Sequence, residues 1–248
     1  MKTYSISNHK GGVGKTTSAV NLGAGIARTG RRVLLIDADP QANLTQSLGA
    51  KPQQGLYRIL EGEAAAPQAV NDTLDLIPAD LDLAGAEVAL AGEPGREFIL
   101  KRAIEHLEYD YVLIDAPPSL GLLTVNALTA SDRVLIPIQA EYLAVQGLAK
   151  LLDVIEKIRK RLNPELEVAG VFLTQYDSRR ILNRDIAGSI QQHLPDKLLA
   201  TRIRNNIALA EAPATGQDIY TYQPSSNGAA TAVRIGCRPT ISAARPAG

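Results

Sequence analysis

Short apolar runs alternate along this chain with longer stretches that have a helical pattern. Six such runs are rich in leucine and β-branched residues, and they lie at residues 4–7, 33–36, 74–77, 111–114, 134–138 and 168–173. Strands separated by helices predict a parallel sheet, because a parallel pair needs a long crossover connection. Several of the runs lack polar alternation, which is typical of strands buried on both faces. The pattern therefore predicts a doubly wound α/β fold, with a mainly parallel sheet and helices on both faces.

One amphipathic helix is clearly marked after Gln146. Apolar residues recur there at spacings of three and four, and charged residues occupy the opposite side. The apolar set is Leu148, Leu151, Leu152, Ile155, Ile158 and Leu162, and the charged set is Lys150, Asp153, Lys157 and Lys160. We expect this helix to lie on the sheet with one face in water. It should end near Asn163, because a residue that precedes proline is pushed out of the helical region.

No linker or internal repeat divides the chain into parts. Its 248 residues are enough for one large α/β domain with a substantial core. We therefore expect a single domain over residues 1–230. The remaining stretch, 231–248, contains Gly236, Pro239 and Pro246 and has no sustained period, so we expect a disordered or atypical C-terminal tail.

Charge and cysteine content narrow the functional classes. Lysine plus arginine and aspartate plus glutamate each number 26, so any DNA binding must come from a local patch rather than a global field. The only cysteine, Cys237, excludes an internal disulfide framework and favours a reducing cytosol. The N-terminus lacks a signal-peptide pattern, and no run approaches the roughly 18–20 apolar residues of a membrane-spanning helix. We therefore expect a cytoplasmic protein that does not use a membrane.

A glycine-rich motif follows the first predicted strand and precedes a helical pattern. Its sequence, KGGVGKTT, lets backbone N–H groups converge on phosphate oxygens at the positive end of the next helix. Lys15 is expected to neutralise the β- and γ-phosphates, and the Thr16 hydroxyl to ligate Mg²⁺. The predicted nucleotide-binding set is Lys10, Gly11, Gly12, Val13, Gly14, Lys15, Thr16 and Thr17.

The loop departs from the usual G-x-x-x-x-G-K-[ST] pattern at its first position, where Lys10 replaces glycine. A cation at that position can point away from its own phosphates and reach a nucleotide on a facing subunit, as an arginine finger does in trans. Lys10 therefore predicts an active site shared by two copies of the chain.

Residues 8–45, which contain this motif, resemble the deviant phosphate loop and first switch of the ParA/MinD superfamily, whose signature residue is that first lysine. The resemblance, which is to ParA/Soj-type partition ATPases, continues through residues 74–87, 109–128 and 208–219. It implies a P-loop NTPase that hydrolyses ATP to ADP with Mg²⁺, slowly without an activating partner. It also implies a homodimer around ATP, non-specific DNA binding, a ParB-like adaptor, a nucleoid-associated location and a cargo such as a plasmid or chromosome.

Two acidic positions follow predicted strands, where ligands bind in an open parallel sheet. Asp115 follows the run 111–114 and resembles the acid that holds the magnesium shell in this superfamily. By the same resemblance, Asp37 lies near the metal and Asp39 orients or activates the attacking water. The implied catalytic residues are Lys10, Lys15, Asp39 and Asp115, and the implied metal residues are Thr16, Asp37 and Asp115.

Arginines in two segments are candidates for a local DNA patch, together with the basic end of the helix after Gln146. The arginines are Arg179, Arg180, Arg202 and Arg204. Each cluster alone is most simply a solvated face, since aromatic residues do not alternate with the charges. Some relatives carry Pro-Arg-Asn where Arg204 begins an Arg-Asn-Asn run here, so Arg204 and Asn205 are also candidates for contacting the nucleotide base.

Several alternatives share the phosphate loop. A MinD-like membrane-associated ATPase would end in a basic amphipathic helix, which Gly236 and Pro239 interrupt here. An iron-protein or arsenite-pump relative would need internal cysteines, and a dethiobiotin-synthetase relative does not fit the Asp-Pro-Gln and Glu-Ala-Pro motifs. A nucleotide-gated binding module with little intrinsic turnover stays open, and DNA retention compared with ATP, ADP and no nucleotide would separate it from the enzyme.

Overall fold

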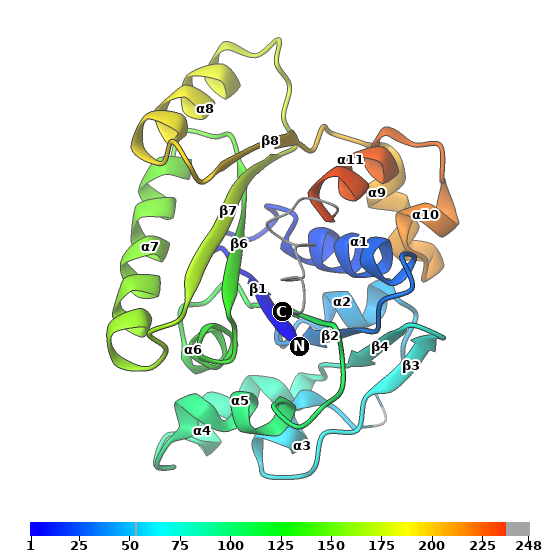
Figure 1. Ribbon diagram of the computed structural model, residues 1–248, viewed down its shortest axis with the longest axis vertical. Coiled ribbons are helices and arrows are strands. Elements are labelled where there is room, and N and C mark those ends of the chain that lie inside the picture. The colour runs from blue at the N-terminus through cyan, green and yellow to red at the C-terminus, as the bar shows by residue number, and fades with distance from the viewer. Residues whose placement is uncertain (53, 237–248) are drawn as a thin grey trace, which may run out of the picture.

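The computed structural model describes residues 1–52 and 54–236, and this part of the chain forms one eight-stranded sheet between two layers of helices (Figure 1). The strand order is β3-β4-β2-β5-β1-β6-β7-β8, and every neighbouring pair is parallel except β3 with β4. The strands are β1 (Lys2–Ile6), β2 (Val33–Asp37), β3 (Gln68–Asn71), β4 (Leu74–Ile77), β5 (Tyr111–Asp115), β6 (Arg133–Gln139), β7 (Glu167–Thr174) and β8 (Leu198–Arg202). The predicted doubly wound, mainly parallel fold is confirmed.

Both faces of the central strands are buried, which explains the absence of polar alternation in the sequence. In β2, Leu35 packs into one core while Leu34 and Ile36 pack into another, and all three side chains are fully buried. Successive side chains of a strand point to opposite faces, so a strand between two helical layers has no face in water and is mostly apolar.

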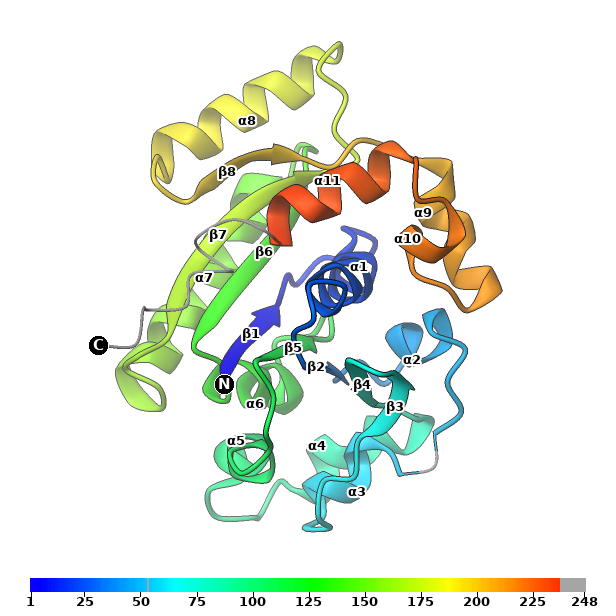
Figure 2. The same ribbon diagram turned by 45° about the vertical axis from the view of Figure 1, so that its right-hand side comes forward.

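Five helices cover one face of the sheet and six cover the other, within the described residues (Figure 2). The first group is α1 (Lys15–Ala27), α2 (Asn43–Ser47), α9 (Ile207–Glu211), α10 (Ile219–Tyr222) and α11 (Asn227–Gly236). The second group is α3 (Leu56–Leu60), α4 (Ala86–Ala89), α5 (Ile99–Ile104), α6 (Leu122–Thr129), α7 (Ala144–Arg161) and α8 (Ile181–His193). Three 3₁₀ turns complete them: η1 (Leu81–Gly85), η2 (Arg96–Phe98) and η3 (Ala212–Thr215).

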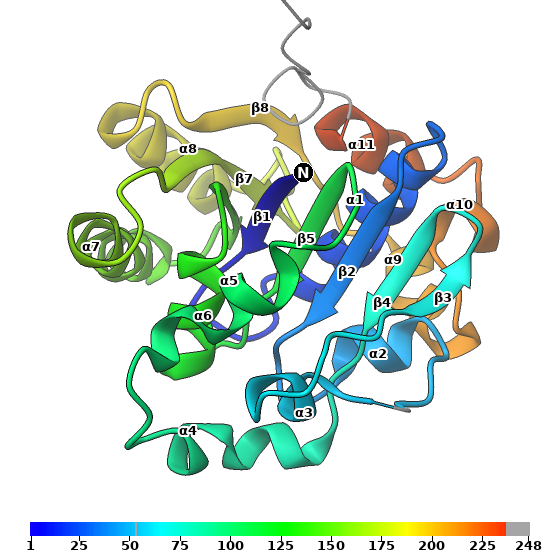
Figure 3. The ribbon, with the colours of Figure 1, turned by 60° about the horizontal axis from the view of Figure 1, so that its bottom comes forward.

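The structure adds two strands that the sequence pattern did not predict. All six predicted strands are present, and α7 ends at Arg161, close to the predicted stop. The two additions, β3 and β8, are the edges of the sheet (Figure 3). Each edge strand is only partly buried and contains polar residues, so its composition resembles that of a surface loop.

The C-terminal boundary also differs from the expectation. We expected no regular period beyond residue 230, but α11 continues to Gly236 and lies beside α1. Its first turns are anchored by Ala229, which is buried in the same core as the α1 side chains. The expectation rested on Gly236, Pro239 and Pro246, which lie at or beyond the end of this helix in the sequence. The rest of the expected tail, 237–248, lies outside the described residues.

A buried amide joins α6 to the end of α7. Asn163 is 5% exposed, and its Nδ2 donates to the carbonyl of Ser131 at 2.7 Å and to two carbonyls at the end of α6. Replacing Asn163 with leucine leaves these carbonyls without that donor in an apolar setting, so we expect the free energy of unfolding to fall by about 1–3 kcal/mol. Urea unfolding measures this.

The matched control is Gln191→Leu, which removes an exposed amide on α8 that donates to one carbonyl, that of Pro195. A surface change of this kind is expected to stay within about 0.5 kcal/mol. Equal unfolding midpoints for the two variants would contradict the role given to Asn163.

The carboxyl ends of three strands meet at the centre of the sheet. β5 lies between β2 and β1, and Asp115 is in register with Asp37 on one side and with Ile6 on the other. The chain turns from each of these ends toward the helices. Polar groups that follow the three strands are thereby brought together at one edge, which is the usual place for a ligand in an open parallel sheet.

Candidate functional site

The loop between β1 and α1 is shaped by two glycines with left-handed backbone. Gly12 has φ 74° and Gly14, the N-cap of α1, has φ 84°. Residues with a side chain rarely adopt such angles, so glycine is required at both positions. The loop folds back over the first turn of a 13-residue helix, where free N–H groups and the helix dipole favour an anion.

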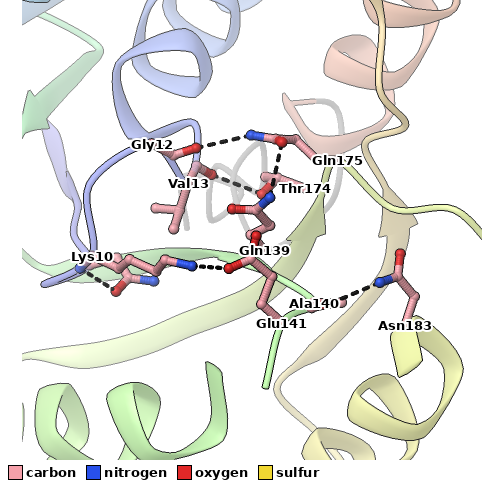
Figure 4. A network of polar contacts seen from close by, with 10 residues as sticks. Lys10, Gly12, Val13, Gln139, Ala140, Glu141, Thr174, Gln175 and Asn183 are labelled. Carbon is pink, nitrogen blue, oxygen red and sulfur yellow. Dashed lines mark hydrogen bonds and ion pairs between the residues drawn. The ribbon is translucent and has the colours of Figure 1, made fainter. Parts of the chain in front are cut away.

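The two lysines of the loop have different surroundings. Lys15 is only 7% exposed, and its Nζ donates to the carbonyl oxygen of Lys10 at 3.1 Å. Burial lowers the pKa of Lys15, and the carboxylates of Asp115 and Asp39 partly oppose this. The Lys10 side chain extends away and forms an ion pair with Glu141, which follows β6 (Figure 4). The structure thus holds Lys15 inside the loop and Lys10 outside it.

Thr16 and Asp115 are joined directly, across 99 positions of sequence. The Thr16 hydroxyl donates to Asp115 Oδ2 at 2.6 Å, and Asp115 Oδ1 is buried without a hydrogen-bond partner among the described residues. Burial is the main cause that raises the pKa of Asp115 well above its usual range, and nearby Asp37 raises it further. The negative charge of such a carboxylate is not balanced by enough hydrogen bonds, so a nearby cation would stabilise it.

Asp37 is fully buried at the end of β2, and its oxygens already have donors. Oδ2 accepts hydrogen bonds from the backbone N–H and the hydroxyl of Thr45, and Oδ1 accepts one from the N–H of Asp39. Burial raises the pKa of Asp37 to about 6, although these bonds lower it. Asp37 therefore ties β2 to α2 and adds negative charge beside Asp115, with which it is in register.

Asp39 lies on the turn after β2 and is 7% exposed. Its Oδ1 accepts a hydrogen bond from the backbone N–H of Gln41 at 3.0 Å. Its backbone carbonyl accepts one from the N–H of Ala42 at 2.8 Å. Ala42, the N-cap of α2, has φ 53°, so this turn is a strained, tight one. The structure brings Asp39 to the same side of the sheet as Lys15, close enough for its charge to act on the lysine.

The donor set fits a magnesium ion that is completed by phosphates and water. Within residues 1–52 and 54–236, no group of three or more His, Cys, Asp or Glu side chains could hold a metal by itself. Mg²⁺ commonly takes one or two protein oxygens and keeps water and substrate phosphates for the rest. The Thr16 hydroxyl and the unpartnered Oδ1 of Asp115 are oxygens of this kind.

A cavity of about 210 Å³ lies beside the phosphate loop. It is lined by Gly14, Thr17 and Ser18 on one side and by Arg204, Asn205 and Asn206 on the other. Arg204 and Asn205, which the sequence suggested as base contacts, are thus placed next to the loop. Asn206 is also the N-cap of α9, and its side-chain oxygen accepts a hydrogen bond from the backbone N–H of Ala208.

The arginines proposed for DNA fall in two places. Arg179 and Arg180 follow β7, and Arg179 is paired with Asp177 through two nitrogens. Arg202 lies on β8 with its guanidinium 4.6 Å from the ring centroid of Tyr176, and with Arg204 it lines a hollow beside α11. Tyr176 is far from both in sequence, so this aromatic and basic grouping could not be seen as a pattern.

Four contacts of the predicted site residues were missed at the sequence level. Thr45 bonds Asp37, Glu141 pairs with Lys10, and two side chains at the end of β7 each bond the phosphate loop. Those two, Thr174 and Gln175, do follow a predicted strand, and that position was the available signal.

None of the helices in the described part of the chain has the length and apolar character to cross a membrane.

A glycine loop that follows the central strand, caps a helix and faces a Thr–Asp pair defines a P-loop nucleotide-binding protein of the α/β class. Comparisons with known proteins specify the family. A family model described as an AAA domain matches residues 1–168. The chromosome-partitioning ATPase Soj of Thermus thermophilus is 45% identical, over 92% of this chain and 91% of the relative. The chromosome partitioning protein ParA of Caulobacter vibrioides is 43% identical, over 99% and 96%.

A solved structure is also similar. It is described as cobyrinic acid a,c-diamide synthase from Mycobacterium smegmatis with bound ATP analog and magnesium. Its TM-score is 0.83 at 36% identity, covering 95% of this chain and 93% of that chain. The family model and the close relatives together establish that this chain belongs to the ParA/Soj family of partition ATPases.

Proposed function

We propose that this chain is an ATP hydrolase that dimerises around MgATP and, in that state, binds DNA non-specifically to position a cargo. The observation that carries the proposal is the 2.6 Å contact between Thr16 and the buried Asp115, at the mouth of a glycine loop that contains Lys15. Two relatives named for chromosome partitioning are 45% and 43% identical to this chain. The structure named as a cobyrinic acid a,c-diamide synthase is 36% identical, so the comparisons support the partition role more strongly.

Nucleotide binding follows from the loop itself. The N–H groups at the start of α1 and the ammonium of Lys15 bind the triphosphate, and Arg204 and Asn205 approach the base. Thr16 and Asp115 would hold Mg²⁺, which when bound neutralises charge on the phosphate oxygens. The Lys15 ammonium donates to the Lys10 carbonyl at 3.1 Å, which keeps the lysine inside the loop that would bind the phosphates.

Hydrolysis needs a water aligned with the γ-phosphate and cations around the charge that develops. Asp39 is the residue assigned to that water, because it begins the turn after β2 and its carboxylate has one oxygen left without a backbone donor among the described residues. Phosphoryl transfer depends mainly on such positioning and on electrostatic stabilisation. Lys15 provides one cation from within the subunit.

Lys10 provides a second cation from the partner copy. In the single chain its ammonium is paired with Glu141, and both side chains are about half exposed. An exposed ion pair contributes little, about 0–1 kcal/mol, so Lys10 can exchange this carboxylate for a facing triphosphate at small cost. Turnover is slow without an adaptor, since a single chain lacks part of its site.

DNA and adaptor binding are assigned to the dimer. Arg179, Arg180, Arg202 and Arg204 are the candidate contacts, and they would bind phosphates rather than bases. The adaptor is a ParB-like protein, and the location is the cytoplasm, on the nucleoid. A MinD-like membrane role is the alternative that the experiment must exclude.

The test compares the purified chain with ATP, with ADP and without nucleotide. We expect a dimer by sedimentation and retention on random-sequence DNA only with ATP, and a steep loss of retention as salt is raised. Vesicles of anionic lipid are the control for the alternative and should not retain the chain. Identical size and DNA retention in all three nucleotide states would contradict the proposal.

A further inference from the structure

The phosphate loop is bonded from outside by the end of β7. The hydroxyl of Thr174, the last residue of that strand, donates to the carbonyl of Val13 at 2.8 Å. The side-chain amide of Gln175 donates through Nε2 to the carbonyl of Gly12 at 3.0 Å (Figure 4). β6 separates β7 from β1 in the sheet, so these contacts are made by a strand that does not neighbour the one leading into the loop.

Fixing these carbonyls also fixes the next N–H groups. A trans peptide unit is planar, and its C=O and N–H point in opposite directions. The bond to Gly12 therefore turns the N–H of Val13 away from β7, and the bond to Val13 does the same for the N–H of Gly14. Neither N–H donates to a backbone carbonyl within the described residues. Successive free N–H groups on one side of a tight loop are what an anion site needs.

Gln175 is itself held in an unusual conformation. Its φ is 49°, one of two positive values at residues other than glycine in the described chain. Such angles persist where the surroundings determine them. The surroundings are visible here: Oε1 of Gln175 accepts a hydrogen bond from Gln139, the last residue of β6, at 3.1 Å. The amide is thus fixed on one side by β6 while its other end bonds the loop.

Thr174 makes a second contact that a hydroxyl alone would not provide. It is 3% exposed, and its methyl carbon lies 3.7 Å from where a Cβ on Gly14 would stand. The side chain therefore packs over the glycine that begins α1 while its hydroxyl bonds the preceding carbonyl. Both contacts restrict the same peptide units.

We infer that Thr174 and Gln175 are positioning residues of the phosphate loop: they hold the Val13 and Gly12 carbonyls toward β7, so that the following N–H groups face the triphosphate. The inference rests on the proposed binding of ATP to this loop. Neither residue is a catalytic residue, because each acts through the backbone of the loop. Thr174 and Gln175 lie at the end of β7, and Gln175 is bonded by β6, whereas the phosphate loop follows β1. The geometry of the loop therefore depends on how β6 and β7 are placed relative to β1.

The test uses two pairs of variants of the full chain. Thr174→Val keeps the shape and the methyl contact but removes the donor, whereas Thr174→Ser keeps the donor. We expect Thr174→Val to weaken binding of Mg-ATP about 10-fold in calorimetry, which corresponds to the loss of one buried hydrogen bond, and Thr174→Ser to stay within about threefold of the unchanged chain. Unchanged affinity in Thr174→Val would overturn the inference.

Gln175→Gly removes the amide and at the same time relieves the positive φ. We expect affinity for Mg-ATP to fall about 5- to 10-fold while the melting temperature of the nucleotide-free chain is unchanged or higher. Magnesium tripolyphosphate, which has no base, should lose affinity by the same factor. A loss confined to Mg-ATP would mean that Gln175 contacts the base from the adjoining cavity, and would overturn the inference for this residue.

A measurement without nucleotide separates this inference from the proposed function. Backbone ¹⁵N order parameters of Val13 and Gly14 in the nucleotide-free chain should fall in Thr174→Val and in Gln175→Gly, and should be retained in Thr174→Ser. If all three variants keep the order parameters of the unchanged chain, the positioning role is wrong even where ATP binds. If the unchanged chain binds no ATP while the order parameters fall as expected in the variants, the proposed function is wrong. The positioning of the loop by Thr174 and Gln175 would then still be supported.

Discussion

Replacing Lys15 with alanine is expected to lower the affinity for Mg-ATP by about 100-fold or more and to abolish measurable phosphate release. Lys15 is 7% exposed inside the phosphate loop, and among the described residues its ammonium donates to a single carbonyl, that of Lys10, so it has further N–H donors for a triphosphate. Removing one partner of a charge-assisted, partly buried contact costs about 3 kcal/mol or more, and each 1.4 kcal/mol is a factor of ten in affinity. Calorimetry with ATP and a phosphate-release assay measure the two effects.

The matched control for this variant is Lys101→Ala, since Lys101 is an exposed lysine on α5, away from the loop. It should bind and hydrolyse ATP like the unchanged chain. Lys15→Ala should retain its fold, because the lysine carries a desolvation cost that alanine lacks; circular dichroism checks this. A Lys15→Ala variant that binds ATP normally would contradict the assignment of the loop as the phosphate site.

Replacing Asp39 with alanine is expected to separate binding from hydrolysis. The carboxylate lies on the turn after β2 and bonds the N–H of Gln41, whereas Thr16 and Asp115 are the pair that would hold Mg²⁺. Affinity for Mg-ATP should therefore stay within a few-fold, while the rate of phosphate release falls by about 10²–10³, the usual contribution of a group that orients or deprotonates a nucleophile. With hydrolysis blocked, the chain should accumulate as an ATP-bound dimer, which sedimentation with ATP measures.

A second substitution distinguishes this chemical role from a structural one. Asp39→Asn keeps an acceptor for the N–H of Gln41, so the turn should be retained, yet the amide cannot act as a base. It should also accumulate as a dimer. Asp72→Ala, on the exposed turn between β3 and β4, is the control and should hydrolyse at the normal rate. Normal phosphate release by Asp39→Ala would remove Asp39 from the mechanism.

The sequence by itself determined the type of fold and the phosphate loop, and the physical reason is that both are local. A strand that is buried on two faces is mostly apolar, so the strands at the centre of the sheet could be predicted from their apolar runs. The loop needs glycines at Gly12 and Gly14 because of backbone angles, and it needs a lysine and a threonine at fixed spacing from them. These requirements involve neighbours in sequence and leave a readable pattern.

Contacts between distant segments were decided only by the tertiary structure. The Lys10 partner Glu141, the Asp37 partner Thr45 and the bonds from Thr174 and Gln175 to the loop each depend on which strands lie side by side. The strand order could not be derived from apolar runs, since such a run shows that a strand is buried but not which strands lie beside it. The edge strands β3 and β8 were missed for a related reason: they are only partly buried, and their stability comes from the neighbours that the fold supplies.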